Sequence, residues 1–245
     1  MKILALDTSS RYGSVALSEH GEMVLELTTR GILTQSETLT RFIERALSDV
    51  GWTIQDIEGF AVVNGPGSFT GIRVGLATVE GFAFATGRPA IAISSLKALA
   101  LGVPGPVPVC PVLNARRGEV YTALYRWDGD RLQELGPERA VSPEQLAREL
   151  TGEILVVGDG ASLVMAALEA GACPVRATAP SGSTGLLRAS VVGAWADQEL
   201  SRDPGRLFPP LRPNYVRVGA SDLGLRKSSA PLIPRAASRD EGRND

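Results

Sequence analysis

The sequence predicts an α/β protein of two duplicated lobes, and three observations support this prediction. Short apolar runs alternate with segments of helical periodicity along the 245-residue chain. Each half begins with the same layout of strand, polar turn, strand, turn and strand. A run of glycine and proline at 102–106 separates the halves. Helices that follow a three-stranded meander in each half favour two related lobes over one doubly wound sheet.

The first half contains the expected meander, further strands and three helices. Its strands are apolar runs bounded by turn residues, at 3–6, 14–17, 23–27, 60–63 and 90–93. From Ser36 to Gly51 the apolar residues follow steps of three and four, which predicts an amphipathic helix. A glycine-rich turn then starts a second helix that runs to about residue 85, and Ser94 starts a third toward Leu101.

The second half repeats this order. Strands are expected at 109–113, 120–125 and 154–157, and helices after Ser142, at 161–170 and at 184–200. Ser142 and Gln145 have the spacing of a capping box, with proline at the first helical position. The expected domains are an N-terminal lobe over 1–103 and a C-terminal lobe over 104–217, whose last helix is free to pack on the N-terminal lobe. The polar segment 218–245 is expected to be a disordered tail.

Composition excludes several classes of protein. The 25 basic and 27 acidic residues give a net charge of -2, which disfavours a nucleic-acid binder acting alone. Two cysteines without C-x-x-C spacing and a single histidine, His20, argue against thiolate zinc sites, most histidine metal sites and HExxH proteases, so no metal or other cofactor is expected. The first apolar run is too short for a signal peptide, and no apolar run reaches about eighteen residues. We therefore expect a cytoplasmic protein that does not bind membranes.

The first candidate site lies at the end of the first strand. Asp7, Thr8 and Ser9 enter a hairpin there, and backbone N–H groups and hydroxyls in such a turn can bind a phosphate, while the acid positions a cation or water. Aspartate and serine are also ordinary turn residues. On these residues alone, the turn interpretation is favoured over the phosphate site.

The second candidate is the run from Gly65 to Gly75. It is not a Walker loop because no lysine stands in the G-K-[ST] position, although a phosphate could approach the start of the helix. Gly67, Gly71 and Gly75 recur every four residues and share one helix face, where another helix can approach closely. Close packing is preferred, since each helical glycine costs about 1 kcal/mol relative to alanine. The spacing leaves open whether the packing partner belongs to this chain or to another.

The two-lobed layout resembles the actin, sugar kinase and Hsp70 superfamily, which has an RNase H-like fold. Within it, three segments are similar to those of the bacterial TsaB family, also called YeaZ: ILALDTS at 3–9, NGPGSFTGIRVG at 64–75 and ARRGEVY at 115–121. The resemblance extends from Met1 to about Arg217, and the glycine-rich run is highly specific. It implies a degenerate fold of this type with dimerisation helices in the N-terminal lobe.

The resemblance implies a subunit of the machinery that makes threonylcarbamoyladenosine beside the anticodon of tRNAs. In that family the transfer is catalysed by a paralogous, metal-bearing partner, TsaD. TsaB forms a helix-mediated heterodimer with TsaD, the ATPase TsaE docks on the pair, and TsaB alone forms a homodimer through the same helices. We therefore expect a non-catalytic subunit that contacts tRNA only through the complex.

The residues agree with a non-catalytic role. A catalytic relative presents paired histidines on the first long helix, whereas this chain has Gln35 at the helix start and no histidine there, so a metal centre cannot be built. Many family members carry histidine in place of Gln35 and aspartate in place of Asn114. With asparagine there, the second hairpin lacks an acid, and Asp7, Thr8 and Ser9 are expected to be at most a vestigial nucleotide site.

The glycine-bearing helix matches the segment that the family uses at its dimer interface, which favours an intermolecular partner for the glycine face. The expected interface combines small residues, apolar anchors and a charged rim: Gly67, Gly71, Gly75, Phe69, Ile72, Val79, Arg41 and Arg45. Gly71→Leu is expected to abolish the association with TsaD.

Three alternatives remain open. A small-molecule kinase of the same superfamily would need tight ATP binding and a second acid in the cleft. A glycoprotease, a label given to relatives in this superfamily, lacks its histidine pair here and is the weakest alternative. The third is a protein that only self-associates. Arg116 and Arg117 could also touch tRNA inside a complex.

Overall fold

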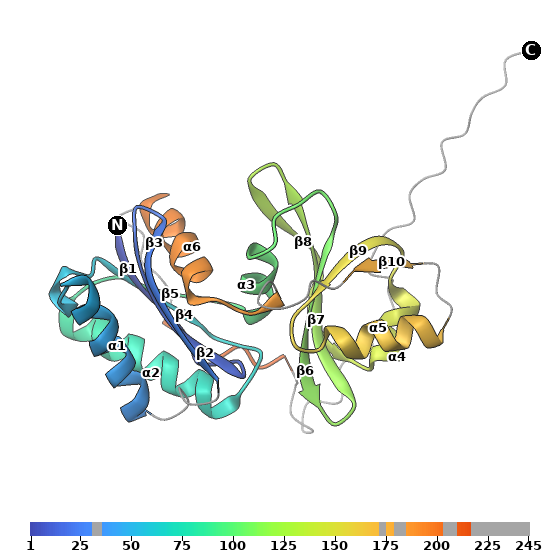
Figure 1. The fold of residues 1–245 in the computed structure, drawn as a ribbon, viewed down its shortest axis with the longest axis horizontal. Helices are drawn as coiled ribbons and strands as arrows, with labels where there is room; N and C mark the ends of the chain where they lie inside the picture. Colours follow the sequence, from blue (N-terminus) through green and yellow to red (C-terminus); the bar gives the residue numbers. More distant parts are fainter. Residues whose placement is uncertain (31–35, 172–174, 179–184, 203–209, 217–245) are drawn as a thin grey trace, which may run out of the picture.

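The computed structural model describes residues 1–30, 36–171, 175–178, 185–202 and 210–216. Within these ranges the chain forms two five-stranded sheets with helices between and outside them (Figure 1). None of the helices in these ranges is both long and apolar enough to span a membrane. The expected tail at 218–245 and the candidate Gln35 lie outside the described residues.

The first sheet has the strand order β3-β2-β1-β4-β5. Its three leading strands form an antiparallel meander and the last two run parallel to β1. Their bounds are β1 Lys2–Asp7, β2 Tyr12–Glu19, β3 Glu22–Arg30, β4 Gly59–Val63 and β5 Ala90–Ile93. Residues of β1 and β4 are almost entirely buried, as expected for central strands covered on both faces.

The second sheet has the order β10-β9-β6-β7-β8, which is the same topology: a meander of three strands followed by two that run parallel to the first. Its strands are β6 Val109–Arg116, β7 Glu119–Asp128, β8 Arg131–Val141, β9 Gly152–Val157 and β10 Val175–Thr178. This identity of topology confirms the predicted α/β fold of two duplicated lobes. The four-residue β10 is absent from the sequence-based prediction, because its sequence VRAT is half polar and lacks the continuous apolar run that marks the equally short β5, AIAI.

Helices cover both sheets and also fill the space between them (Figure 1). They are α1 Ser36–Val50, α2 Phe69–Thr86, α3 Ser95–Leu101, α4 Pro143–Glu149, α5 Ala161–Ala170 and α6 Ala189–Arg202, with a short 3₁₀ turn η1 at Ile54–Asp56. One apolar core joins α1 and α2 to the outer face of the first sheet, and another joins α4 and α5 to the outer face of the second. A third core between the sheets contains α3 and α6. The two sheets therefore pack with α3 and α6 between them, and the other helices cover their outer faces.

The last helix follows the second sheet in sequence but packs on the first. Arg188 pairs with Glu26 of β3 at 2.6 Å, and the N–H of Ala189 donates to the Ser14 hydroxyl of β2 at 3.0 Å. These tertiary partners satisfy the start of α6, so the helix begins at Ala189 and the predicted start at residue 184 is wrong. The sequence near residue 184 could not indicate this start, because the residues that cap the helix lie on the distant β2–β3 hairpin.

Candidate functional site

The loop after β1 closes around the carboxylate of Asp7. Asp7 Oδ1 accepts hydrogen bonds from the Ser9 backbone N–H at 2.8 Å and the Ser9 hydroxyl at 2.7 Å, and Oδ2 accepts one from the Ser10 hydroxyl at 2.7 Å. The carboxylate is fully buried, and this burial raises the pKa of Asp7 above its ordinary value despite the hydrogen bonds. All three donors follow Asp7 directly in the chain, so the local sequence is sufficient to build the turn.

The two hydroxyls expected to bind a phosphate are engaged inside the protein. Thr8 Oγ1 donates to the Gly71 carbonyl at 2.6 Å, and Ser9 Oγ lies 3.1 Å from the Ser95 hydroxyl at the start of α3. The Ser9 carbonyl accepts a hydrogen bond from the N–H of Ser68, the N-cap residue of α2, at 2.7 Å. Thr8 and Ser9 are at most 2% exposed. In this arrangement neither hydroxyl faces the solvent.

The glycines of α2 allow the helix to close over this loop. A Cβ atom at Gly67 would lie 2.3 Å from the Ser9 carbonyl oxygen, and one at Gly71 would lie 1.9 Å from the Thr8 carbonyl oxygen. At Gly75 it would lie 2.4 Å from Thr8 Oγ1. Only glycine permits so close an approach of helix and loop. The prediction that this glycine face receives a partner protein is therefore wrong, because the chain's own loop fills it.

The other expected interface residues divide between core and surface. Ile72 and Val79 are buried between α2 and the first sheet, so the prediction that they contact a partner is also wrong. Phe69 is exposed at the start of α2, and Arg41 and Arg45 lie on the exposed side of α1. Three of the eight expected residues thus present side chains to the solvent, and the period-four pattern could not separate them from the buried ones.

A cluster of three side chains fixes the last described segment of the chain to α2. The rings of Phe69 and Tyr215 stack with centroids 5.5 Å apart, and the Arg73 guanidinium lies 3.9 Å from the Phe69 ring centroid. Arg73 Nε also donates to the Tyr215 hydroxyl at 3.1 Å. The backbone N–H of Asn214 donates to the Asn64 carbonyl at 2.8 Å. The segment 210–216 therefore returns to the glycine-rich loop of the first lobe.

The second hairpin, between β6 and β7, has a different construction from the first. Asn114 Oδ1 accepts a hydrogen bond from the Arg116 N–H at 2.8 Å, and the Asn114 N–H donates to the Asp159 carboxylate at 2.8 Å. Arg116 and Arg117 are exposed and adopt positive φ values of 61° and 53°. The hairpin therefore has a carboxylate beside it after all. It comes from the loop after β9, and the sequence of the hairpin gave no sign of it.

Glu138 joins the two lobes, and sequence reasoning missed it. Its side chain, on β8, accepts hydrogen bonds from the Ser94 hydroxyl, from the Tyr125 hydroxyl at 3.3 Å and from Asn214 Nδ2 at 2.7 Å. Ser94 is the N-cap of α3 and Asn214 belongs to the returning segment, so one carboxylate binds three parts of the fold. No local pattern around Glu138 distinguishes it from the neighbouring acids of the strand. Among the described residues there is no group of three or more potential metal ligands.

Comparison with known proteins places the chain among tRNA-modification proteins. Residues 33–165 match the family model described as TsaD, tRNA N6-adenosine threonylcarbamoyltransferase. The chain is 31% identical over 167 residues to the tRNA threonylcarbamoyladenosine biosynthesis protein TsaB of Bacillus subtilis, covering 66% of this chain and 73% of that protein. It is 33% identical over 169 residues to the Escherichia coli TsaB protein, covering 65% and 72%.

Solved structures agree with this similarity. YeaZ from Pseudomonas aeruginosa superimposes with a TM-score of 0.69 at 28% identity, covering 83% of this chain and 93% of that one. The crystal structure of an uncharacterized protein with similarity to peptidase YeaZ, from the same organism, gives a TM-score of 0.71 at 27% identity, covering 88% of this chain and 99% of that one. The likeness therefore spans both lobes.

Proposed function

The chain belongs to the TsaB (YeaZ) family, and on this premise we propose that it is a non-catalytic subunit in the biosynthesis of threonylcarbamoyladenosine in tRNA. The closed loop around Asp7 is the observation that carries the non-catalytic part of this proposal. A phosphoryl-transfer site needs exposed donors and acids that face the substrate. Here the hydroxyls of Thr8 and Ser9 are bonded to α2 and α3, and the Asp7 carboxylate is bonded to its own turn.

The surface that we propose for the partner is the solvent-facing side of α2, together with the exposed face of α1. Arg73, Ala77, Gly81 and Phe84 follow one another along α2 at helical spacing and are all exposed. Phe84 is 93% exposed, and no atom lies within 4 Å of a Cβ built at Gly81. A large exposed aromatic beside small residues is typical of a helix that another helix approaches closely. Arg41 and Arg45 of α1 would supply the charged rim, as predicted.

The partner that this surface would bind is a homologue of TsaD, the protein whose family model matches this chain. Shared ancestry of the two chains supports a pseudo-symmetric heterodimer in which equivalent helices pack together. In the absence of the TsaD homologue, we propose that the same face of α1 and α2 forms a homodimer. A TsaE homologue would dock on the pair, and tRNA would be contacted only through the complex.

Light scattering of the purified chain, alone and mixed with the TsaD homologue of its organism, tests this proposal. We expect a homodimer that converts to a one-to-one heterodimer. Phe84→Glu is expected to prevent both assemblies, whereas Leu163→Glu, on α5 of the other lobe and 41% exposed in the unaltered protein, is expected to leave them intact. An unchanged mass on mixing would refute the partner assignment. Tight ATP binding by the isolated chain in calorimetry would instead support a small-molecule kinase.

A further inference from the structure

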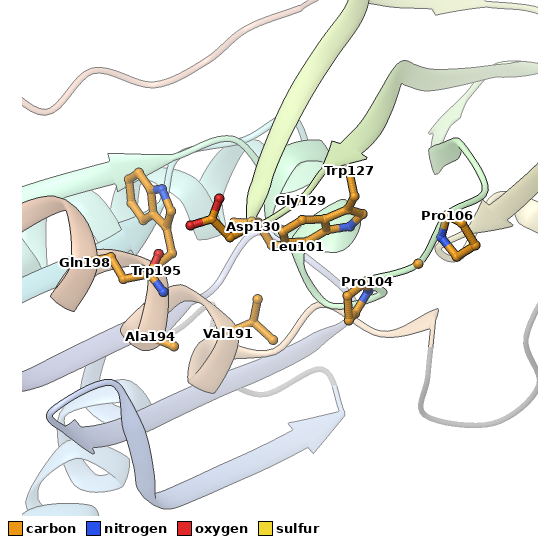
Figure 2. Close-up of a pocket in the computed structure, with 11 residues that line it drawn as sticks. Leu101, Pro104, Pro106, Trp127, Gly129, Asp130, Val191, Ala194, Trp195 and Gln198 are labelled. Carbon is orange, nitrogen blue, oxygen red and sulfur yellow. The ribbon is translucent and has the colours of Figure 1, made fainter.

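A hollow of about 770 Å³ lies between the two lobes, away from the Asp7 loop (Figure 2). Three elements form its walls: the end of α3 with the following turn, the tip of the β7–β8 hairpin, and the exposed side of α6. The lining residues that matter for binding are aromatic, proline or polar, namely Trp127, Trp195, Pro104, Pro106, Asp130 and Gln198. The volume falls in the range of ligand-binding clefts.

The chemistry of this hollow is unusual for a solvent-facing surface. Two of the three tryptophans of the chain line it, and Figure 2 shows the Asp130 carboxylate between their indole rings. The indole N–H of Trp127 is buried and has no hydrogen-bond acceptor among the described residues. Asp130 is exposed and forms no ion pair within the described part of the chain, and Lys97 Nζ lies 5.6 Å from the Trp195 ring centroid. The hollow therefore offers aromatic faces and an unpaired negative charge.

These features match what a proline-rich segment requires. Polyproline II segments dock in grooves lined by aromatic side chains, where proline rings pack on the indole faces. A carboxylate beside such a groove selects an arginine next to the prolines. The occupant should therefore carry two prolines, apolar residues between them and an adjacent arginine.

The chain itself contains such a segment. Residues 231–235 read Pro-Leu-Ile-Pro-Arg, with Arg235 directly after the second proline. We propose that the hollow binds residues 231–235 of the same chain, with Pro231 and Pro234 on the indole rings and Arg235 paired with Asp130. This inference goes beyond the proposed function and does not depend on it.

The length of the chain permits this contact. The described chain ends at Val216, and the residues from there to Pro231 can span up to about 50 Å when extended. Asn214, two residues before Val216, bonds to Glu138 of β8 at 2.7 Å, and Glu138 is eight residues along the chain from Asp130, a span of at most about 29 Å. The segment can therefore reach the hollow, and a contact within one molecule is favoured by high effective concentration.

Limited trypsin digestion of the full-length protein, followed by mass spectrometry, tests the proposal. Cleavage after Lys227 provides the internal reference, and cleavage after Arg235 reports on the proposed contact. If the segment is bound for most of the time, cleavage after Arg235 should be at least about tenfold slower than cleavage after Lys227, because proteolysis follows the population of the open form. Equal rates at the two sites would overturn the proposal.

Two variants of the β7–β8 hairpin separate binding from general effects of charge. Asp130→Asn removes the carboxylate from the hollow and should abolish most of the protection at Arg235. Asp128→Asn is the matched control, because Asp128 carries the same charge in the same hairpin but accepts a hydrogen bond from Gln133 and does not line the hollow. Protection that survives Asp130→Asn, or that is lost equally in both variants, would contradict the pairing with Arg235.

A photo-crosslinking residue locates the segment directly. In an Ile233→p-benzoylphenylalanine variant, irradiation should join the segment to peptides that contain Trp127 or Trp195. Crosslinks confined to other surfaces would overturn the proposal. Crosslinks and tryptic protection that grow with protein concentration would show binding between two copies, and would overturn the contact within one chain.

Discussion

Replacing Gly71 with alanine tests whether α2 closes on the Asp7 loop in the way that the structure shows. The added Cβ atom would stand 1.9 Å from the Thr8 carbonyl oxygen, and it would also disturb the 2.6 Å hydrogen bond from Thr8 Oγ1 to the Gly71 carbonyl. Neither group can move freely, since Thr8 is 1% exposed and lies in the turn around Asp7. The helix or the loop must therefore shift.

The size of the effect follows from three contributions. Overpacking a close contact costs about 1–3 kcal/mol, and loss of one intramolecular hydrogen bond costs about 0.5–1.5 kcal/mol. Alanine stabilises the helix by about 1 kcal/mol relative to glycine, because it has the higher helix propensity. We therefore expect Gly71→Ala to lower the free energy of unfolding by about 1–3 kcal/mol.

Gly81→Ala is the matched control on the same helix. No atom lies within 4 Å of a Cβ built at Gly81, so only the helix propensity changes, and this variant should gain up to about 1 kcal/mol. Urea unfolding followed by circular dichroism measures both free energies under the same conditions. If Gly71→Ala were as stable as Gly81→Ala, the reasoning that the glycine face is filled by the chain's own loop would be refuted.

Further predictions concern buried ionisable groups. Burial raises the pKa of Asp7 above 3.8, so the free energy of unfolding should fall as the pH rises from that value through the raised pKa. Asp7→Asn should flatten this dependence in urea titrations at several pH values, and an unchanged slope would contradict it. Glu138→Ala leaves donors from three segments without an acceptor and should cost about 1–3 kcal/mol, whereas Glu134→Ala, exposed on the same strand, should change stability by less than about 0.5 kcal/mol. Equal losses of stability in these two variants would argue against the conclusion that Glu138 joins the two lobes. Burial raises the pKa of the Cys110 thiol to about 11, so iodoacetamide at pH near 7 should label Cys110 only after unfolding; mass spectrometry of the native protein decides this.

The sequence predicted most of the fold because its signals are local. Helix α2 shows this well. It was predicted from the glycine-rich turn before it and from Gly87 after it; in the structure the Ser68 hydroxyl accepts a hydrogen bond from the Gly71 N–H, and the helix ends where Gly87 adopts a positive φ of 68°. The repeated meander likewise depends on short apolar runs and turn residues that lie next to each other in the chain. The prediction failed at the start of α6, where the capping partners are distant in the chain, and at β10, where half of the strand residues are polar.

The candidate site was predicted only in part, because its meaning depends on contacts between segments. The sequence singled out the Asp7 loop and the glycine-rich run as separate candidates, each with a phosphate interpretation. The structure joins them, since Gly71 of one meets Thr8 of the other. Residue spacing shows that a helix face is free of side chains, but it does not show which part of the chain fills that face.

Local periodicity and turn residues thus determined the two-lobed α/β class and the duplication, and three short motifs carried the family resemblance, because each of these is encoded in neighbouring residues. Tertiary structure decided three further points: that the glycine face of α2 packs inward, that Glu138 links both lobes to Asn214, and that two tryptophans meet across a hollow. The physical reason is the same in each case. These contacts join residues far apart in the chain, and their energies depend on distance and burial, which exist only after the two sheets have packed around their common core.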